Sequence, residues 1–150
     1  MTHERSPSTA QWRERLASCG LTVLPESEHP ALPDVRQSIY AVTGMEVEPT
    51  IRIDRSAPEA DLELGRQWQD QARQANLYTD DGEFFVLPPG SGGLEIGWVR
   101  VRNRAGNDLL SRVKRTIGQF ELITASADGR NLCAVTSEEY EYWIIVRSLS

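Results

Sequence analysis

Hydrophobic residues recur at intervals of three and four along four stretches of the chain, the spacing that gives a helix one apolar face. The third stretch shows the pattern best, because Leu64, Trp68 and Ala72 fall on one stripe. Ser56 and Glu59 precede this stripe with the spacing of a capping box, in which side chains bond the free N–H groups of the first turn. The predicted helices are Thr9–Cys19, Asp34–Thr43, a stretch that opens at Ser56 and runs to about Ala75, and Asn107–Ile117.

Alternating or continuous apolar runs predict strands between these helices and after them. In the run from 94 to 103 the apolar positions change face at Gly97, so that Trp98 and the later Val101 point to opposite sides. An inserted residue would restore one buried face, and we expect a β-bulge at this glycine. The predicted strands are Leu21–Leu24, Thr50–Asp54, Phe84–Leu87, Leu94–Asn103, Phe120–Thr124, Leu132–Thr136 and a last strand from Tyr140 to Arg147.

The order of these elements predicts an α+β fold. Strands that follow one another in the second half of the chain pair most readily as antiparallel hairpins, and Asp128-Gly129 supplies one turn signal. We expect a single domain over residues 8–150, with a mostly antiparallel sheet and about four helices packed on one side of it. Residues 1–7 are polar and are expected to form a disordered tail.

The composition narrows the class of protein. Acidic residues outnumber basic ones by 22 to 16, for a formal net charge of −6, which argues against a protein that coats nucleic acid. The longest apolar run, Tyr142–Val146, is far shorter than the roughly 20 residues that span a bilayer. No signal peptide is visible, and two cysteines do not make a disulfide framework. We therefore expect a cytoplasmic protein that neither enters a membrane nor has nucleic acid as its partner. The preference for arginine over lysine suggests a GC-rich source, such as a bacterium or its phage.

The residues that most often carry catalysis form no recognisable arrangement. Cys19 and Cys133 fall on predicted apolar stripes, where small hydrophobic side chains are usual. His3 and His29 stand in polar segments without a visible partner, and a lone histidine makes neither a general base nor a metal site. Ser91 is flanked by glycines, but the Gly-x-Ser-x-Gly elbow of hydrolases is absent. The sequence therefore favours a protein without catalytic activity, cofactor or metal.

Carboxylates gather at two points of the sequence, before the third and before the last predicted strand. Such clusters are often solvated loops, but an acidic surface can also cover a basic groove and associate with it quickly. Our leading hypothesis is a small acidic domain that binds a basic surface of another protein. A bacterial immunity or antitoxin-like protein that caps a toxin, or an accessory protein, would fit this description. The residues predicted to contact the partner are Asp80, Asp81 and Glu83 in the first cluster and Glu138, Glu139, Tyr140 and Glu141 in the second.

Basic residues concentrate between residues 100 and 115, where Asp108 is the only carboxylate. A predicted helix begins in this stretch, and the free N–H groups of a helix N-terminus favour an anion. One interpretation is a site for phosphate or an acidic partner, as in a phage or regulatory assembly component that binds nucleic acid or an acidic protein. The other is that these arginines pair with the chain's own surplus carboxylates. The arginines of the candidate anion site are Arg100, Arg102, Arg104, Arg112 and Arg115.

The same stretch resembles the acetyl-CoA site of the GNAT acyltransferases. The predicted strand Leu94–Asn103 leads through a glycine-containing loop into a helix. In that family the strand ends in Gln/Arg-x-x-Gly-x-Gly/Ala, and loop amides hold the pyrophosphate at the helix N-terminus. The equivalent positions here are Asn103-Arg104-Ala105-Gly106-Asn107-Asp108. Gly106 matches, whereas Asp108 puts a negative charge where a small residue lets phosphate approach. The resemblance implies an acyl-CoA-dependent transferase as an alternative function.

Overall fold

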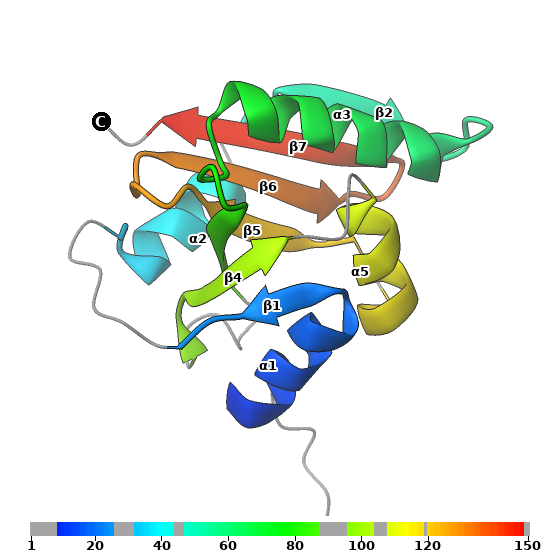
Figure 1. Cartoon of the computed structure of the whole chain (residues 1–150). Helices are drawn as coiled ribbons and strands as arrows, with labels where there is room; N and C mark the ends of the chain where they lie inside the picture. Colours follow the sequence, from blue (N-terminus) through cyan, green and yellow to red (C-terminus); the bar gives the residue numbers. More distant parts are fainter. Residues whose placement is uncertain are drawn as a thin grey trace, which may run out of the picture.

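The computed structural model describes residues 9–25, 32–43, 47–87, 96–103, 108–118 and 120–148. Within these ranges one seven-stranded sheet has the order β1-β4-β3-β5-β6-β7-β2, and every pair of neighbouring strands is antiparallel (Figure 1). The strands are β1 (Leu21–Val23), β2 (Ile51–Asp54), β3 (Glu83–Leu87), β4 (Val99–Asn103), β5 (Leu122–Ala125), β6 (Asn131–Ser137) and β7 (Glu141–Ser148). The helices of the described ranges are α1 (Thr9–Ser18), α2 (Val35–Thr43), α3 (Ala60–Gln74) and α5 (Leu109–Ile117). The predicted α+β class is confirmed. The predicted tail, residues 1–7, lies outside the described residues.

The helix with the clearest apolar stripe is confirmed, but its predicted start is wrong. Leu64, Trp68 and Ala72 of α3 are fully buried. The helix begins at Ala60, after Glu59 in a left-handed conformation with φ of 61°, and no side chain caps it. Ser56 is not the cap, because the cap position before Ala60 is occupied by Glu59; the Ser56 hydroxyl donates to the Asp54 carboxylate, at 2.7 Å. A local turn at the end of β2 therefore takes the place of the predicted capping box.

Both faces of the sheet are covered, which corrects the expectation that the helices share one side. Neighbouring residues of β3 are buried on opposite faces, with Phe84 in one apolar cluster and Phe85 in the other. The first cluster packs under α1, α3 and α5, and the second packs under α2 (Figure 1). The β5–β7 strands are apolar on both sides, as a sheet between two layers requires.

Strand β4 is shorter than its sequence pattern predicts. Residues 94 and 95 lie outside the described part of the chain, and the strand begins only at Val99. Gly97 has a φ of 78°, which turns the chain before the strand starts, so the predicted bulge within the strand is wrong. Trp98 follows this turn and packs on the α2 side, where its indole N–H donates to the Pro33 carbonyl at 2.9 Å.

The strand register places the two acidic clusters at opposite ends of the sheet. Tyr142 pairs with Ser137, so the turn between β6 and β7 lies beyond this pair, at one end. Phe85 pairs with Ala125, so the start of β3 lies at the other end, beside the turn between β5 and β6. The residues that precede β3 therefore cannot share a surface patch with Glu138–Glu141.

Candidate functional site

Three carboxylates lie side by side across the sheet at the end where β6 turns into β7. Asp54, the last residue of β2, is the register partner of Glu141. On the other side of Glu141, the Glu138 N–H donates to the Glu141 carbonyl at 2.8 Å. The cross-strand row is thus Asp54, Glu141, Glu138. Like charges directly opposite on neighbouring strands destabilise a sheet, so packing alone does not account for this row.

The next row along the strands adds an aromatic ring and a further carboxylate. Trp143 is the register partner of Arg52 on one side and of Thr136 on the other. Glu121 precedes β5, and together with Thr136 it lines a hollow beside Trp143. Trp143 packs against the cluster under α2, so both rows lie on the α2 side of the sheet.

This region is the part of the α2 side that the helix leaves open. Beneath α2, Ala134 and Ile145 are fully buried. Farther along the same strands, side chains are half-buried or exposed, and Tyr140 in the turn is 73% exposed. We define the acidic face as Asp54, Glu121, Thr136, Glu138, Glu139, Tyr140, Glu141 and Trp143.

The carboxylates of the acidic face have no ion-pair partner within 4.0 Å among the described residues. The two nearby arginines are occupied in other ways. The Arg55 guanidinium donates to the main-chain carbonyl of Glu138 at 2.7 Å and lies 5.1 Å from the centre of the Tyr142 ring. Arg52 lies 5.6 Å from the centre of the Trp143 ring. The negative charge of the face is therefore available to a partner.

Hydrogen bonds fix two of these carboxylates. The hydroxyl and the N–H of Ser56 both donate to Asp54 and hold the pKa of that carboxyl below its usual value. The charge of Asp54 therefore persists to lower pH than that of an unassisted aspartate. The Trp143 indole N–H donates to Glu141 at 3.1 Å, which orients both side chains. Asp54 and Glu141 are thus oriented by neighbours in the same chain.

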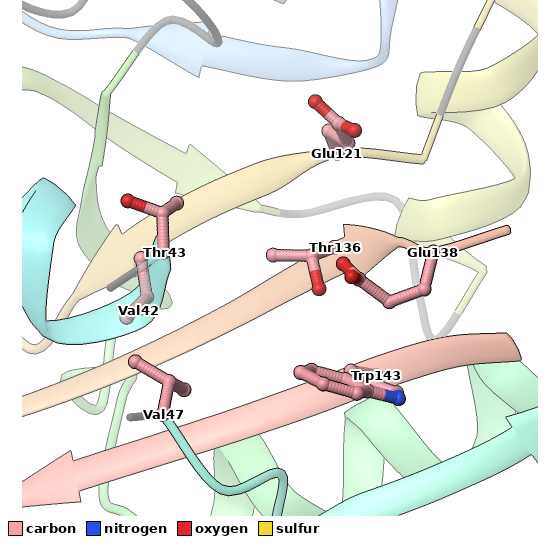
Figure 2. A pocket seen from close by; sticks show the side chains of 7 residues that line it. All are labelled: Val42, Thr43, Val47, Glu121, Thr136, Glu138 and Trp143. Carbon is pink, nitrogen blue, oxygen red and sulfur yellow. The ribbon is translucent and has the colours of Figure 1, made fainter. Parts of the chain in front are cut away.

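A hollow of about 340 Å³ opens at the edge of the acidic face, where α2 ends (Figure 2). Val42 and Val47 form its apolar side, and the Trp143 ring lies opposite them. Glu121 and Glu138 bring carboxylates to it from the ends of two strands. We call this space the Trp143 hollow; its lining residues are Val42, Thr43, Val47, Glu121, Thr136, Glu138 and Trp143.

The first predicted acidic cluster has a different environment. Asp80 and Asp81 lie in the turn before β3, at the far end of the sheet, and Asp81 is exposed. Glu83 is largely buried, with 15% of its side chain exposed, and accepts hydrogen bonds from Arg100 at 2.8 Å and Arg102 at 3.2 Å. Glu83 therefore holds two neighbouring strands together within the chain. The structure brings Glu138, Glu139, Tyr140 and Glu141 together and separates them from this cluster.

The described arginines of the predicted anion site do not share one surface. Arg100 and Arg102 alternate on β4 with Val101, which is buried under α1, α3 and α5, so these arginines point to the opposite side. Arg112 stands on α5, with 11% of its side chain exposed, and donates to the Cys19 carbonyl at 2.6 Å and to Asn103 at 2.9 Å.

On the same helix Arg112 also pairs with Asp108 at 2.9 Å, whereas the exposed Arg115 lies 3.9 Å from that carboxylate. Arg100, Arg102 and Arg112 therefore pair with carboxylates of the same chain, which is the second of the two interpretations of the basic stretch. Arg104 and the loop 104–107 of the acyltransferase resemblance lie outside the described residues, so that resemblance stays a prediction.

Sequence reasoning missed Asp54, Glu121, Thr136 and Trp143 as members of the acidic face. Asp54 reaches it through the pairing of β2 with β7, a long-range contact that no local pattern reports. Alternation along β7 did indicate that Trp143 and Tyr142 point to opposite faces. That alternation left open which of the two aromatic side chains is exposed.

The buried cysteines and the remaining carboxylates give no other site among the described residues. No group of three or more His, Cys, Asp or Glu in the described ranges could hold a metal ion. Burial raises the pKa of both thiols, that of Cys133 to about 12. In the same part of the chain no helix is long and apolar enough to cross a membrane.

Fold and site together define a small antiparallel α+β domain with a partly open, acidic sheet face. Comparison of the chain with models of known protein families, with curated proteins and with solved structures gives no match.

Proposed function

We propose that this domain binds another protein by docking a basic surface of that partner onto the acidic face. The observation that carries the proposal is the cross-strand row Asp54, Glu141, Glu138, whose carboxylates have no ion-pair partner among the described residues. Their mutual repulsion weakens the sheet. A basic partner would relieve that repulsion. Binding therefore favours negative charge at these positions, whereas the stability of the free domain favours its removal.

The surroundings of the row suit an interface. Tyr140 and Trp143 stand at its border, and exposed or half-buried aromatic residues are frequent anchors in protein interfaces. The excess of acidic residues over the whole chain would speed the encounter with a basic partner. The finer proposal is an immunity or antitoxin-like protein, or an accessory protein, that covers the basic cleft of its partner.

Two double variants with the same change in net charge test this proposal. Glu139→Gln/Glu141→Gln alters the acidic face, and the amide oxygen introduced at position 141 would still accept the Trp143 N–H. Asp80→Asn/Asp81→Asn alters the turn at the other end of the sheet. Both raise the formal net charge from −6 to −4, so a difference between them reports position rather than total charge.

The immobilised full chain is used to capture partners from a lysate of its source cells, and the affinity of the purified partner is then measured by calorimetry. The control variant should bind as the unmodified chain does. The face variant should bind about tenfold more weakly, a loss of about 1.4 kcal/mol. Equal affinity of the two variants for every captured protein would overturn the proposal.

A further inference from the structure

We infer that the Trp143 hollow is the socket for a single arginine side chain of the partner. The inference rests on the proposed function, and it names the side chain of the partner that would bind at this part of the acidic face. It follows from three features of the hollow: carboxylates and a buried hydroxyl that have no partner in the described part of the chain, and an aromatic ring.

The charges of the hollow select a cation. Glu121 and Glu138 line it from the start of β5 and the end of β6, and neither has an ion-pair partner within 4.0 Å among the described residues. None of the lining residues that the structure describes is positively charged, since the other members are aliphatic, aromatic or hydroxyl side chains. Arg52 and Arg55 lie near the hollow but contact the Trp143 ring and a main-chain carbonyl rather than these carboxylates. The two carboxylates therefore still attract an external cation, and partial enclosure strengthens that attraction.

The hydroxyl of Thr136 adds an unmet hydrogen bond. Its Oγ1 atom exposes less than 1 Å² and has no hydrogen-bond partner among the described residues. Figure 2 shows Thr136 beside Glu138 and above the Trp143 ring. A buried polar group without a partner is costly. A cationic ligand with several N–H donors would satisfy the hydroxyl and the neighbouring Glu138 carboxylate, with Glu121 adding negative charge at the rim of the hollow.

Among biological cations, a guanidinium fits these features best. It is planar, stacks on an indole ring and offers five N–H donors that two carboxylates and a hydroxyl can share. An ammonium group has three donors on a compact charge and makes no planar stack. Within the chain itself, the guanidinium of Arg52 lies 5.6 Å from the centre of the same Trp143 ring.

The hollow is large enough for one arginine side chain. A volume of about 340 Å³ lies at the lower end of small-ligand sites, which span roughly 300–1,000 Å³. Val42 and Val47 can cover the aliphatic stem of an arginine while the carboxylates take its head group. Neighbouring basic residues of the same partner would then meet Glu139 and Glu141 across the rest of the face.

The test follows the indole N–H resonance of Trp143 in the ¹⁵N-labelled full chain, assigned with a Trp143→Phe variant. The probe is the blocked tripeptide Gly-Arg-Gly, compared with blocked Gly-Lys-Gly and Gly-Gln-Gly. Millimolar arginine peptide should shift the resonances of Trp143 and Thr136 saturably, because one side chain supplies only a small part of an interface. The lysine peptide should bind at least threefold more weakly, and the glutamine peptide should cause no saturable shift.

Glu121→Gln/Glu138→Gln should weaken binding of the arginine peptide at least tenfold, while Asp80→Asn/Asp81→Asn leaves it unchanged. Both variants raise the net charge by two, and each single substitution is measured in case the double variant does not fold. Equal binding of all three peptides, or equal binding by both double variants, would overturn the inference.

The partner assay separates this inference from the proposed function. If only the socket is wrong, the single variant Glu121→Gln, which leaves the Asp54–Glu141–Glu138 row intact, keeps the partner affinity that Glu139→Gln/Glu141→Gln loses. If the proposed function is wrong, neither variant changes affinity for any captured protein.

Discussion

Neutralising the central carboxylate of the acidic row should make the protein more stable. Glu141 has Asp54 opposite on one side and Glu138 on the other, so Glu141→Gln removes both repulsions in one step. Side chains in such pairs have Cβ atoms about 5 Å apart. At a charge separation of about 6 Å in a water-like medium, each repulsion amounts to about 0.7 kcal/mol.

Two contacts reduce the expected gain. The hydrogen bond from the Trp143 indole to Glu141 becomes a weaker neutral one. The Arg55 guanidinium, held on the carbonyl of Glu138, already offsets part of the repulsion. Together these contacts remove about 0.5 kcal/mol. We therefore expect Glu141→Gln to raise the free energy of unfolding by about 1 kcal/mol, which corresponds to a rise in Tm of about 2–4 °C.

Urea denaturation at low and high salt measures this effect. The gain should be present at about 0.01 M NaCl and largely disappear at 1 M, where the Debye length is about 3 Å. Asp81→Asn is the matched control, since Asp81 is exposed in a turn outside the strand register, and it should change stability by less than about 0.5 kcal/mol. A destabilised Glu141→Gln variant, or a gain that salt does not reduce, would refute the claim that the row is repulsive.

Three further predictions concern the interior. Glu83→Gln should destabilise the fold by about 1–3 kcal/mol, because it leaves the partly buried guanidinium groups on β4 without their carboxylate; an unchanged denaturation midpoint would show that this pairing is not structural. Phe84→Ala should lower the free energy of unfolding by about 3–5 kcal/mol, since the ring is fully buried and packs edge-on against Tyr78. A loss below about 1 kcal/mol, measured by calorimetric unfolding, would contradict this prediction. Cys19 and Cys133 are fully buried with raised thiol pKa values, so neither should react with a thiol reagent at about pH 8 until denaturant is added; rapid labelling of the native chain would count against the buried placement.

Helices and strands were predictable from the sequence wherever the local spacing of apolar residues matches the burial of those residues in the fold. The stripe of α3 and the alternation along β7 survive into the structure because each reports a periodicity that burial enforces. Gly118 ends α5 in the left-handed conformation, with φ of 95°, a conformation that glycine adopts without steric penalty. The start of α3 was not predictable, because Ser56 has the spacing of a capping residue but forms a local turn with Asp54, and the helix begins only at Ala60.

The composition of the acidic face depended on pairings that sequence periodicity does not encode. Glu138 and Glu141 flank one hairpin turn, so their proximity follows from local sequence. Asp54 joins them only because β2 adds to the far edge of β7. Conversely, Glu83 of the first predicted cluster is paired within the chain, because β4 places Arg100 and Arg102 beside it. In both cases the register between distant strands, rather than the local clustering of charge, decided which carboxylates stay unpaired.

The salt dependence of the association rate tests the docking of a basic partner on the acidic face most directly. With the purified partner, Glu139→Gln/Glu141→Gln should slow association at low salt and flatten its dependence on ionic strength, while Asp80→Asn/Asp81→Asn follows the unmodified chain. Identical rates and identical salt dependence for the two variants would contradict the account.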